Sequence, residues 1–68
     1  MVQRKAGGYV FRMYDNDHPP LHVHVFLDGR EVAKYDLENG RFLELTNHRH
    51  AGRIRRALFR AGFIERAD

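Results

Sequence analysis

Residues 9–45 largely alternate between apolar and polar side chains, and two glycine-containing dipeptides interrupt the alternation. Asp28-Gly29 and Asn39-Gly40 are typical of tight hairpin turns, because these residue types tolerate a positive φ. Side chains along a strand point alternately to its two faces, so the parity of a residue number indicates its face. The pattern predicts antiparallel strands joined by short hairpins for the first two thirds of the chain.

Four strands are expected from this alternation, over residues 9–14, 21–27, 31–37 and 41–45. The second strand begins only after Pro20, because proline cannot donate a hydrogen bond to a neighbouring strand. Two-residue turns would mix polar and apolar residues on each face of the sheet. Three-residue loops, Leu27-Asp28-Gly29 and Glu38-Asn39-Gly40, keep them apart, so we expect loops of this length.

These loops bring the odd-numbered apolar residues to one face of the sheet. That face is expected to hold Tyr9, Phe11, Met13, Leu21, Val23, Val25, Leu27, Ala33, Tyr35, Leu37, Leu43 and Leu45. The opposite face is expected to stay open to solvent and to hold Arg12, Tyr14, His22, His24, Phe26, Lys34, Asp36, Phe42 and Glu44. In this register His22 lies opposite Lys34.

The last third of the chain has helical spacing, and a helix is expected over residues 47–61. Asn47 or Thr46 can cap its start, and Gly62 can take the left-handed conformation that ends it, with Phe63 packing back on Leu58. One apolar stripe should cover the odd-numbered face of the sheet, and it consists of Ala51, Ile54, Ala57, Leu58 and Ala61.

The expected fold is therefore α+β: a four-stranded antiparallel meander with one C-terminal helix packed on one face. A chain of 68 residues has room for one domain, residues 1–68. Within it we expect a flexible segment over 1–8, strands over 9–45, the helix, and a tail over 62–68.

Composition limits the functional classes. The chain has no cysteine, which excludes a disulfide framework and a thiolate metal site. No apolar run approaches the roughly 20 residues that span a bilayer, so we expect no membrane association. The first residues lack the apolar stretch of a secretory signal, and a cytoplasmic location is expected.

Positive charge is concentrated at the C-terminal end. The net charge is +3, and residues 46–68 carry six arginines against two carboxylates. Four of these arginines share the side of the helix away from the apolar stripe, namely Arg49, Arg53, Arg56 and Arg60. Together with Arg12 they are the candidate nucleic-acid-binding residues, since the guanidinium group binds two phosphate oxygens at once. A merely solvated helix face would look the same.

Three aromatic residues are also expected to be exposed. Tyr14 and Phe26 lie beside cations on the open face, an arrangement used to stack single-stranded nucleic acid and equally explained by cross-strand packing. Phe59 lies off the apolar stripe, which makes a homo-oligomer a further expectation.

Histidines form the second candidate site. His22 and His24 share a face of one strand, and His18 precedes them in the same connection as Asp17. His18, His22, His24 and Asp17 could hold a divalent transition metal such as zinc, nickel or copper. Alternatively His22 and His24, beside Lys34, could act as catalytic acid and base on a phosphodiester. A third interpretation is that these histidines only form local hydrogen bonds in the scaffold.

The run Phe11-Arg12-Met13-Tyr14, followed by residues 17–25, resembles the signature of the bacterial family called domain of unknown function 4160. Six positions match its histidine–proline motif: Asp17, His18, Pro20, His22, His24 and Val25. Leu21 stands where the second proline is usual and Val23 where phenylalanine is usual. Tyr35-Asp36-Leu37-Glu38-Asn39-Gly40 and the basic helix extend the likeness to about residue 62.

The resemblance implies a small stand-alone protein, similar in some members to components of toxin–antitoxin or mobile-element loci. It favours a nucleic acid or a protein as partner, and it marks the three histidines as a site. We therefore expect a nucleic-acid- or partner-binding accessory protein. A small histidine-dependent hydrolase or ribonuclease, with or without a metal, and a structural oligomerisation module are the two alternatives.

Overall fold

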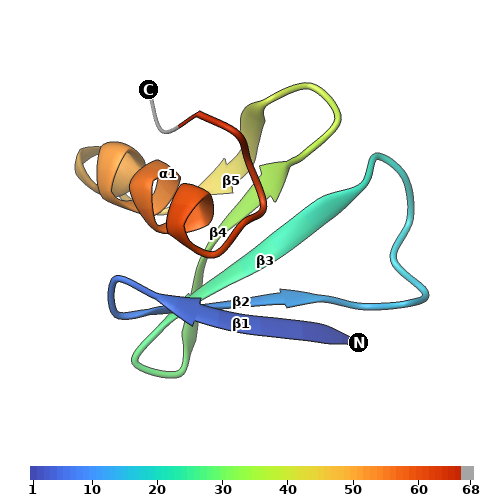
Figure 1. Cartoon of the computed structure of the whole chain (residues 1–68), viewed down its shortest axis with the longest axis horizontal. Coiled ribbons are helices and arrows are strands. Elements are labelled where there is room, and N and C mark those ends of the chain that lie inside the picture. The colour runs from blue at the N-terminus through green and yellow to red at the C-terminus, as the bar shows by residue number, and fades with distance from the viewer. Residues whose placement is uncertain (67–68) are drawn as a thin grey trace.

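The computed structural model describes residues 1–66, which form a twisted five-stranded antiparallel sheet and one helix across one of its faces (Figure 1). The strands are neighbours in sequence order, β1 (Val2–Ala6), β2 (Tyr9–Met13), β3 (His22–Leu27), β4 (Arg30–Asp36) and β5 (Arg41–Leu45). A short 3-10 helix, η1 (His48–His50), leads directly into α1 (Ala51–Arg60). The α+β class with a C-terminal helix is confirmed, and the number of strands is five rather than four.

Strand β1 is the one that the sequence did not predict. It pairs with β2 from Val2 opposite Met13 to Ala6 opposite Tyr9, across a two-residue turn at Gly7 and Gly8. Residues 1–8 are expected as a flexible segment, whereas residues 2–6 form this edge strand, and four of its five residues are exposed. An exposed edge strand needs no apolar alternation, and it therefore leaves no hydrophobic period to detect.

The first hairpin has a shorter turn than expected. Leu27 pairs with Arg30, and the two-residue turn between them has positive φ at both positions, 52° and 81°. The register then shifts, because Phe26 pairs with Glu31 but Val25 pairs with Ala33, which leaves one extra residue on β4. The three-residue loop is wrong, and a β-bulge restores the parity instead. His24, rather than His22, consequently lies opposite Lys34.

The second hairpin also contains a bulge. Asp36 pairs with Arg41 across a four-residue connection, so the expected three-residue loop Glu38-Asn39-Gly40 is wrong. Tyr35 pairs with Phe42 and Lys34 with Glu44, which leaves Leu43 as an extra residue on β5. Phe42 therefore packs on the core side, with its ring 4.9 Å from that of Tyr35, whereas Leu43 is 38% exposed. The expected face of Phe42 is thus wrong, and Leu43 is exposed rather than part of the core. Leu21, which precedes β3, is also exposed rather than part of the core.

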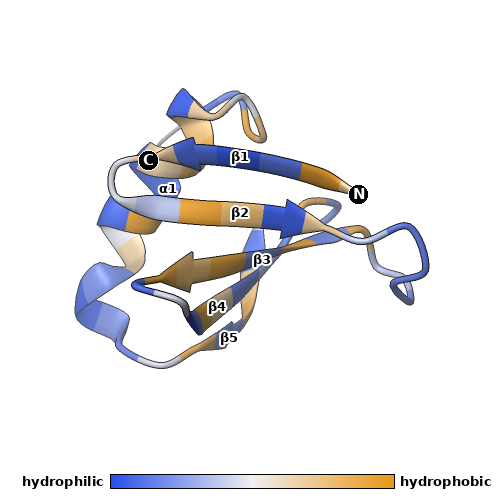
Figure 2. Cartoon of the chain, turned by 90° about the horizontal axis from the view of Figure 1, so that it is seen from below, coloured by the Kyte–Doolittle hydropathy of each residue, from blue (hydrophilic) through white to orange (hydrophobic). Residues whose placement is uncertain are grey.

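The core lies between the sheet and α1. Figure 2 shows apolar residues on the strands beside the helix, and the buried set is Tyr9, Phe11, Val23, Val25, Ala33, Tyr35, Ile54, Ala57 and Leu58. Val23 and Val25 have no exposed surface, while the intervening His24 belongs to the other face. The central expectation, that the apolar odd-numbered residues of β3 face the helix, is confirmed.

Both ends of the helical segment follow the expected chemistry. The Asn47 side chain accepts a hydrogen bond from the Arg49 backbone, so this residue caps η1. Gly62 has a φ of +85°, and the Phe63 N–H donates to the Leu58 carbonyl, as in a Schellman ending. The predicted tail is packed at Phe63 and Ile64, and residues 67–68 lie outside the described residues.

In residues 1–66, no helix is both long enough and apolar enough to cross a membrane.

Candidate functional site

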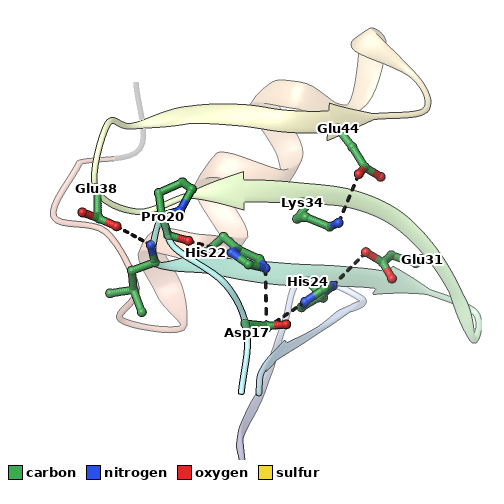
Figure 3. Close-up of polar contacts among 9 residues, drawn as sticks. Asp17, Pro20, His22, His24, Glu31, Lys34, Glu38 and Glu44 are labelled. Carbon is green, nitrogen blue, oxygen red and sulfur yellow. Dashed lines mark hydrogen bonds and ion pairs between the residues drawn. The ribbon is translucent and has the colours of Figure 1, made fainter. Parts of the chain in front are cut away.

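The connection between β2 and β3 folds back over the face of the sheet opposite α1, where it places a carboxylate against two histidines of β3 (Figure 3). His22 and His24 are two residues apart on one strand, so their side chains share a face. Oδ2 of Asp17 lies 3.0 Å from Nε2 of His24 and 3.5 Å from Nε2 of His22. The two imidazole ring centres are 5.0 Å apart.

A second layer of acceptors fixes the orientation of both rings. Nδ1 of His22 lies 2.7 Å from the carbonyl oxygen of Pro20, and Nδ1 of His24 lies 2.9 Å from Oε2 of Glu31. A carbonyl oxygen can only accept, so Nδ1 of His22 carries a proton. His24 has a carboxylate oxygen at both ring nitrogens, Glu31 at Nδ1 and Asp17 at Nε2. Tyr14 packs edge-on against His24, with the ring centres 4.9 Å apart.

The site is shielded from solvent. The exposed fraction is 9% for the His22 side chain, 12% for His24 and 29% for Asp17. Burial acts to raise the pKa of Asp17, but the hydrogen bond and charge of His24, with smaller contributions from Tyr14 and His22, lower it below its ordinary value. Asp17 is therefore a carboxylate at neutral pH.

His18 lies apart from this cluster. The ligand atoms of Asp17, His22 and His24 all lie within 4.8 Å of one another, and His18 is not in that group. His18 is exposed and lines a neighbouring pocket of about 270 Å³, whose wall also includes Asp17 and His22. The structure thus brings together three of the four metal-ligand candidates.

Lys34 faces the histidines from β4, but another residue holds its ammonium group. Nζ donates to Oε2 of Glu44 at 3.1 Å. This hydrogen bond is the main cause that raises the pKa of Lys34 above its ordinary value, and burial only partly opposes it. Lys34 therefore stays charged at neutral pH, with its ammonium group paired to Glu44.

Asp36 serves the turn between β4 and β5 rather than the histidine cluster. Its carboxylate accepts from the backbone N–H groups of Glu38 and Asn39 and from the Asn39 side chain at 2.8–3.0 Å. The Asn39 amide chiefly lowers the pKa of Asp36, against the effect of burial. The role of this carboxylate is structural.

Glu31 is the site residue that sequence reasoning missed. Its odd number assigns it to the core side in an unbroken strand. The bulge on β4 lies between Glu31 and Ala33, and it turns Glu31 towards the histidines. Only the position of the bulge could have revealed this contact.

The candidate nucleic-acid-binding residues lie on two separate surfaces. Arg49, Arg53, Arg56 and Arg60 are all exposed along η1 and α1, and we call them the arginine face. Arg12 instead lies on the sheet, where it donates to Gln3 at 2.8 Å and stacks over Phe26 at 4.9 Å. Phe59, which is 48% exposed, lies next to the arginine face on α1.

The fold defines a class of protein: a small α+β domain in which a five-stranded meander carries one helix on one face and a histidine–carboxylate cluster on the other. A family model described as Domain of unknown function (DUF4160) matches residues 8–59. Because the match covers most of the chain, the protein belongs to this family. The matched residues include the whole histidine cluster but not β1. No curated protein and no solved structure matches the chain.

Proposed function

We propose that this protein is an accessory protein of the toxin–antitoxin or mobile-element type that binds nucleic acid through its arginine face. One observation carries the proposal. Within residues 1–66, none of the four arginines of this face forms an ion pair with a carboxylate, although all four are exposed. Other cations of these residues, Arg4, Lys5 and Arg30 among them, also lack an ion pair, so what distinguishes this face is the clustering of four exposed arginines on one helical segment.

The length and chemistry of the face suit a phosphate backbone. Residues 48–60 contain no acidic side chain. Arg49 and Arg60 are eleven residues apart, which corresponds to about 16 Å along a helix. One strand of a duplex presents a phosphate every 3.4 Å or so along its axis, so the face spans several phosphates. Each guanidinium can bind two oxygens of such a group.

Phe59 adds an aromatic surface at the border of the arginine face. Bases of a single strand stack on exposed aromatic rings, whereas the bases of a duplex are already stacked. A Phe59→Ala variant should therefore weaken binding of a single strand more than binding of a duplex.

The two alternatives have less support. A hydrolase without metal needs groups free to exchange protons with a substrate, but the imidazole nitrogens of His22 and His24 contact Asp17, Pro20 and Glu31. Lys34 is in turn held by Glu44. An oligomerisation module would use Phe59 and the exposed edge strand β1. It would bind without a need for the arginines.

The test compares two variants with the same change of charge. Arg53→Glu with Arg56→Glu reverses two charges on the arginine face, and Lys5→Glu with Arg30→Glu reverses two exposed charges on the sheet. Fluorescence anisotropy at low salt, with a labelled duplex and the corresponding single strand, should show that only the first variant loses binding. Its melting temperature should stay close to that of the wild type, because exposed charges contribute little to folding. Equal binding by the wild type and the first variant contradicts the proposal.

A further inference from the structure

We propose that Asp17, His22 and His24 form a zinc site that keeps one coordination position open. The inference is independent of the arginine face, which lies on the helix at the other side of the sheet (Figures 1 and 3). Its basis is the arrangement of three donor atoms together with the groups that orient them.

The carboxylate oxygen already has the spacing of a tetrahedral site from both imidazole nitrogens. Zinc binds imidazole nitrogen and carboxylate oxygen at about 2.0–2.2 Å, which places neighbouring ligands of a tetrahedron about 3.3 Å apart. Oδ2 of Asp17 lies 3.0 Å from Nε2 of His24 and 3.5 Å from Nε2 of His22. All three donor atoms lie within 4.8 Å of one another. A cation can enter with small shifts of side chains.

With both rings neutral, hydrogen-bond accounting leaves a place for a cation between the three donor atoms. The Pro20 carbonyl and the Glu31 carboxylate each accept from an Nδ1–H, so a neutral ring presents a bare lone pair at Nε2. Both lone pairs then face a carboxylate oxygen, which also has only lone pairs to offer. Three acceptors that point at one position repel one another unless a proton or a metal ion lies between them. A proton on Nε2 of His24 satisfies only its pair with Asp17, whereas one divalent cation satisfies all three donor atoms.

The second layer is also typical of metal sites. A histidine that binds a metal usually donates its other N–H to a carboxylate or a backbone carbonyl, which fixes the ring and makes the ligand more basic. Glu31 fills this role for His24, and the Pro20 carbonyl fills it for His22. Glu31 is therefore a positioning residue, not a ligand.

The donor set selects the metal class. Two imidazole nitrogens and one carboxylate, without thiolate, suit zinc and its transition-metal neighbours, whereas magnesium prefers six oxygen ligands. Three protein ligands leave a fourth position for water or a small anion, as in catalytic rather than structural zinc sites. Asp17 and His22 both line the pocket of about 270 Å³, through which such a ligand can reach the ion.

The test is a titration of the tag-free protein with Zn²⁺, followed by calorimetry and by melting temperature. The wild type should bind one equivalent and melt at a higher temperature, and Mg²⁺ should have neither effect. His24→Ala and Asp17→Ala should both abolish this saturable binding. Asp17 belongs to an exposed connection, so its variant is expected to fold even if the His24 variant does not, and circular dichroism checks this.

His48→Ala is the matched control, because it removes an exposed histidine far from the cluster and should bind Zn²⁺ like the wild type. Glu31→Ala should keep the stoichiometry but weaken affinity by about 10–100-fold, the usual effect of losing such a partner. With Co²⁺, the wild type should show the visible absorption of a four-coordinate ion. No saturable uptake by the wild type, or unchanged affinity in Asp17→Ala, overturns the site. Unchanged affinity in Glu31→Ala overturns its positioning role.

Discussion

Asp36 shows how one buried carboxylate can hold a hairpin together. Its side chain has no exposed surface, and it accepts three hydrogen bonds from the turn that follows β4. The Arg41 guanidinium lies 3.8 Å away and adds a weaker attraction. The lowered pKa of Asp36 means that the folded state stabilises the ionised carboxylate more than the unfolded state does.

The stability of the protein should therefore depend on the charge of Asp36. A carboxylate whose pKa is lowered by folding stabilises fully above its unfolded pKa, about 4, and loses this effect as the pH falls through its folded value. Asp36→Asn should melt below the wild type at neutral pH, and the difference should shrink in acid below about pH 4. Thermal melts across pH measure this. The control Asp28→Asn removes an exposed carboxylate, and an Asp36 difference that stays constant with pH would contradict the account.

For individual residues, the sequence predicted which side chains could form a site but not which groups would contact them. The shared face of His22 and His24 follows from their spacing of two and was predictable. The role of Glu31 depends on a bulge, and the separation of His18 from the cluster depends on the path of an irregular connection. Neither leaves a periodic signal in the sequence.

Among the elements, α1 and the inner strands were predictable and the hairpin details were not. Apolar alternation in β2, β3 and β4 indicated the core face, because burial on one side enforces a period of two. Loop length was inferred from parity, but a two-residue turn plus a bulge yields the same parity as a three-residue loop. In the second hairpin a four-residue connection pairs Phe42 with the buried Tyr35, and Leu43 is the extra residue of β5. Strand β1 was missed because its side chains are mostly exposed.

The end of α1 provides a prediction about stability. Gly62 has a φ of +85°, and a Cβ there would lie 3.1 Å from Nη1 of Arg4, which itself donates to the Ala61 carbonyl. Gly62→Val should lower the free energy of unfolding by about 1–2 kcal/mol, the cost of forcing a side chain into the left-handed region. Gly62→Asn should cost less, because asparagine tolerates this conformation. Urea unfolding measures both, and equal stability of Gly62→Val and the wild type would contradict this ending of the helix.

For the whole molecule, the sheet separates two surfaces of different chemistry. The helix side presents an arginine face that lacks carboxylate partners within residues 1–66, and the other side presents the histidine–carboxylate cluster. A single hydrophobic core lies between the sheet and the helix, formed by buried side chains of both. The two surfaces share no residue, so the loss of one function by substitution should leave the other intact.

The most direct measurement for the arginine face is the salt dependence of nucleic-acid affinity. Each neutralised phosphate of a duplex contributes about −0.9 to the slope of log K against log salt, so four arginines predict a slope of about −3 to −4. Arg53→Gln with Arg56→Gln removes two contacts and should make the slope shallower by about 2. A wild-type affinity that does not change with salt, or a slope that is the same in the variant, would contradict the account.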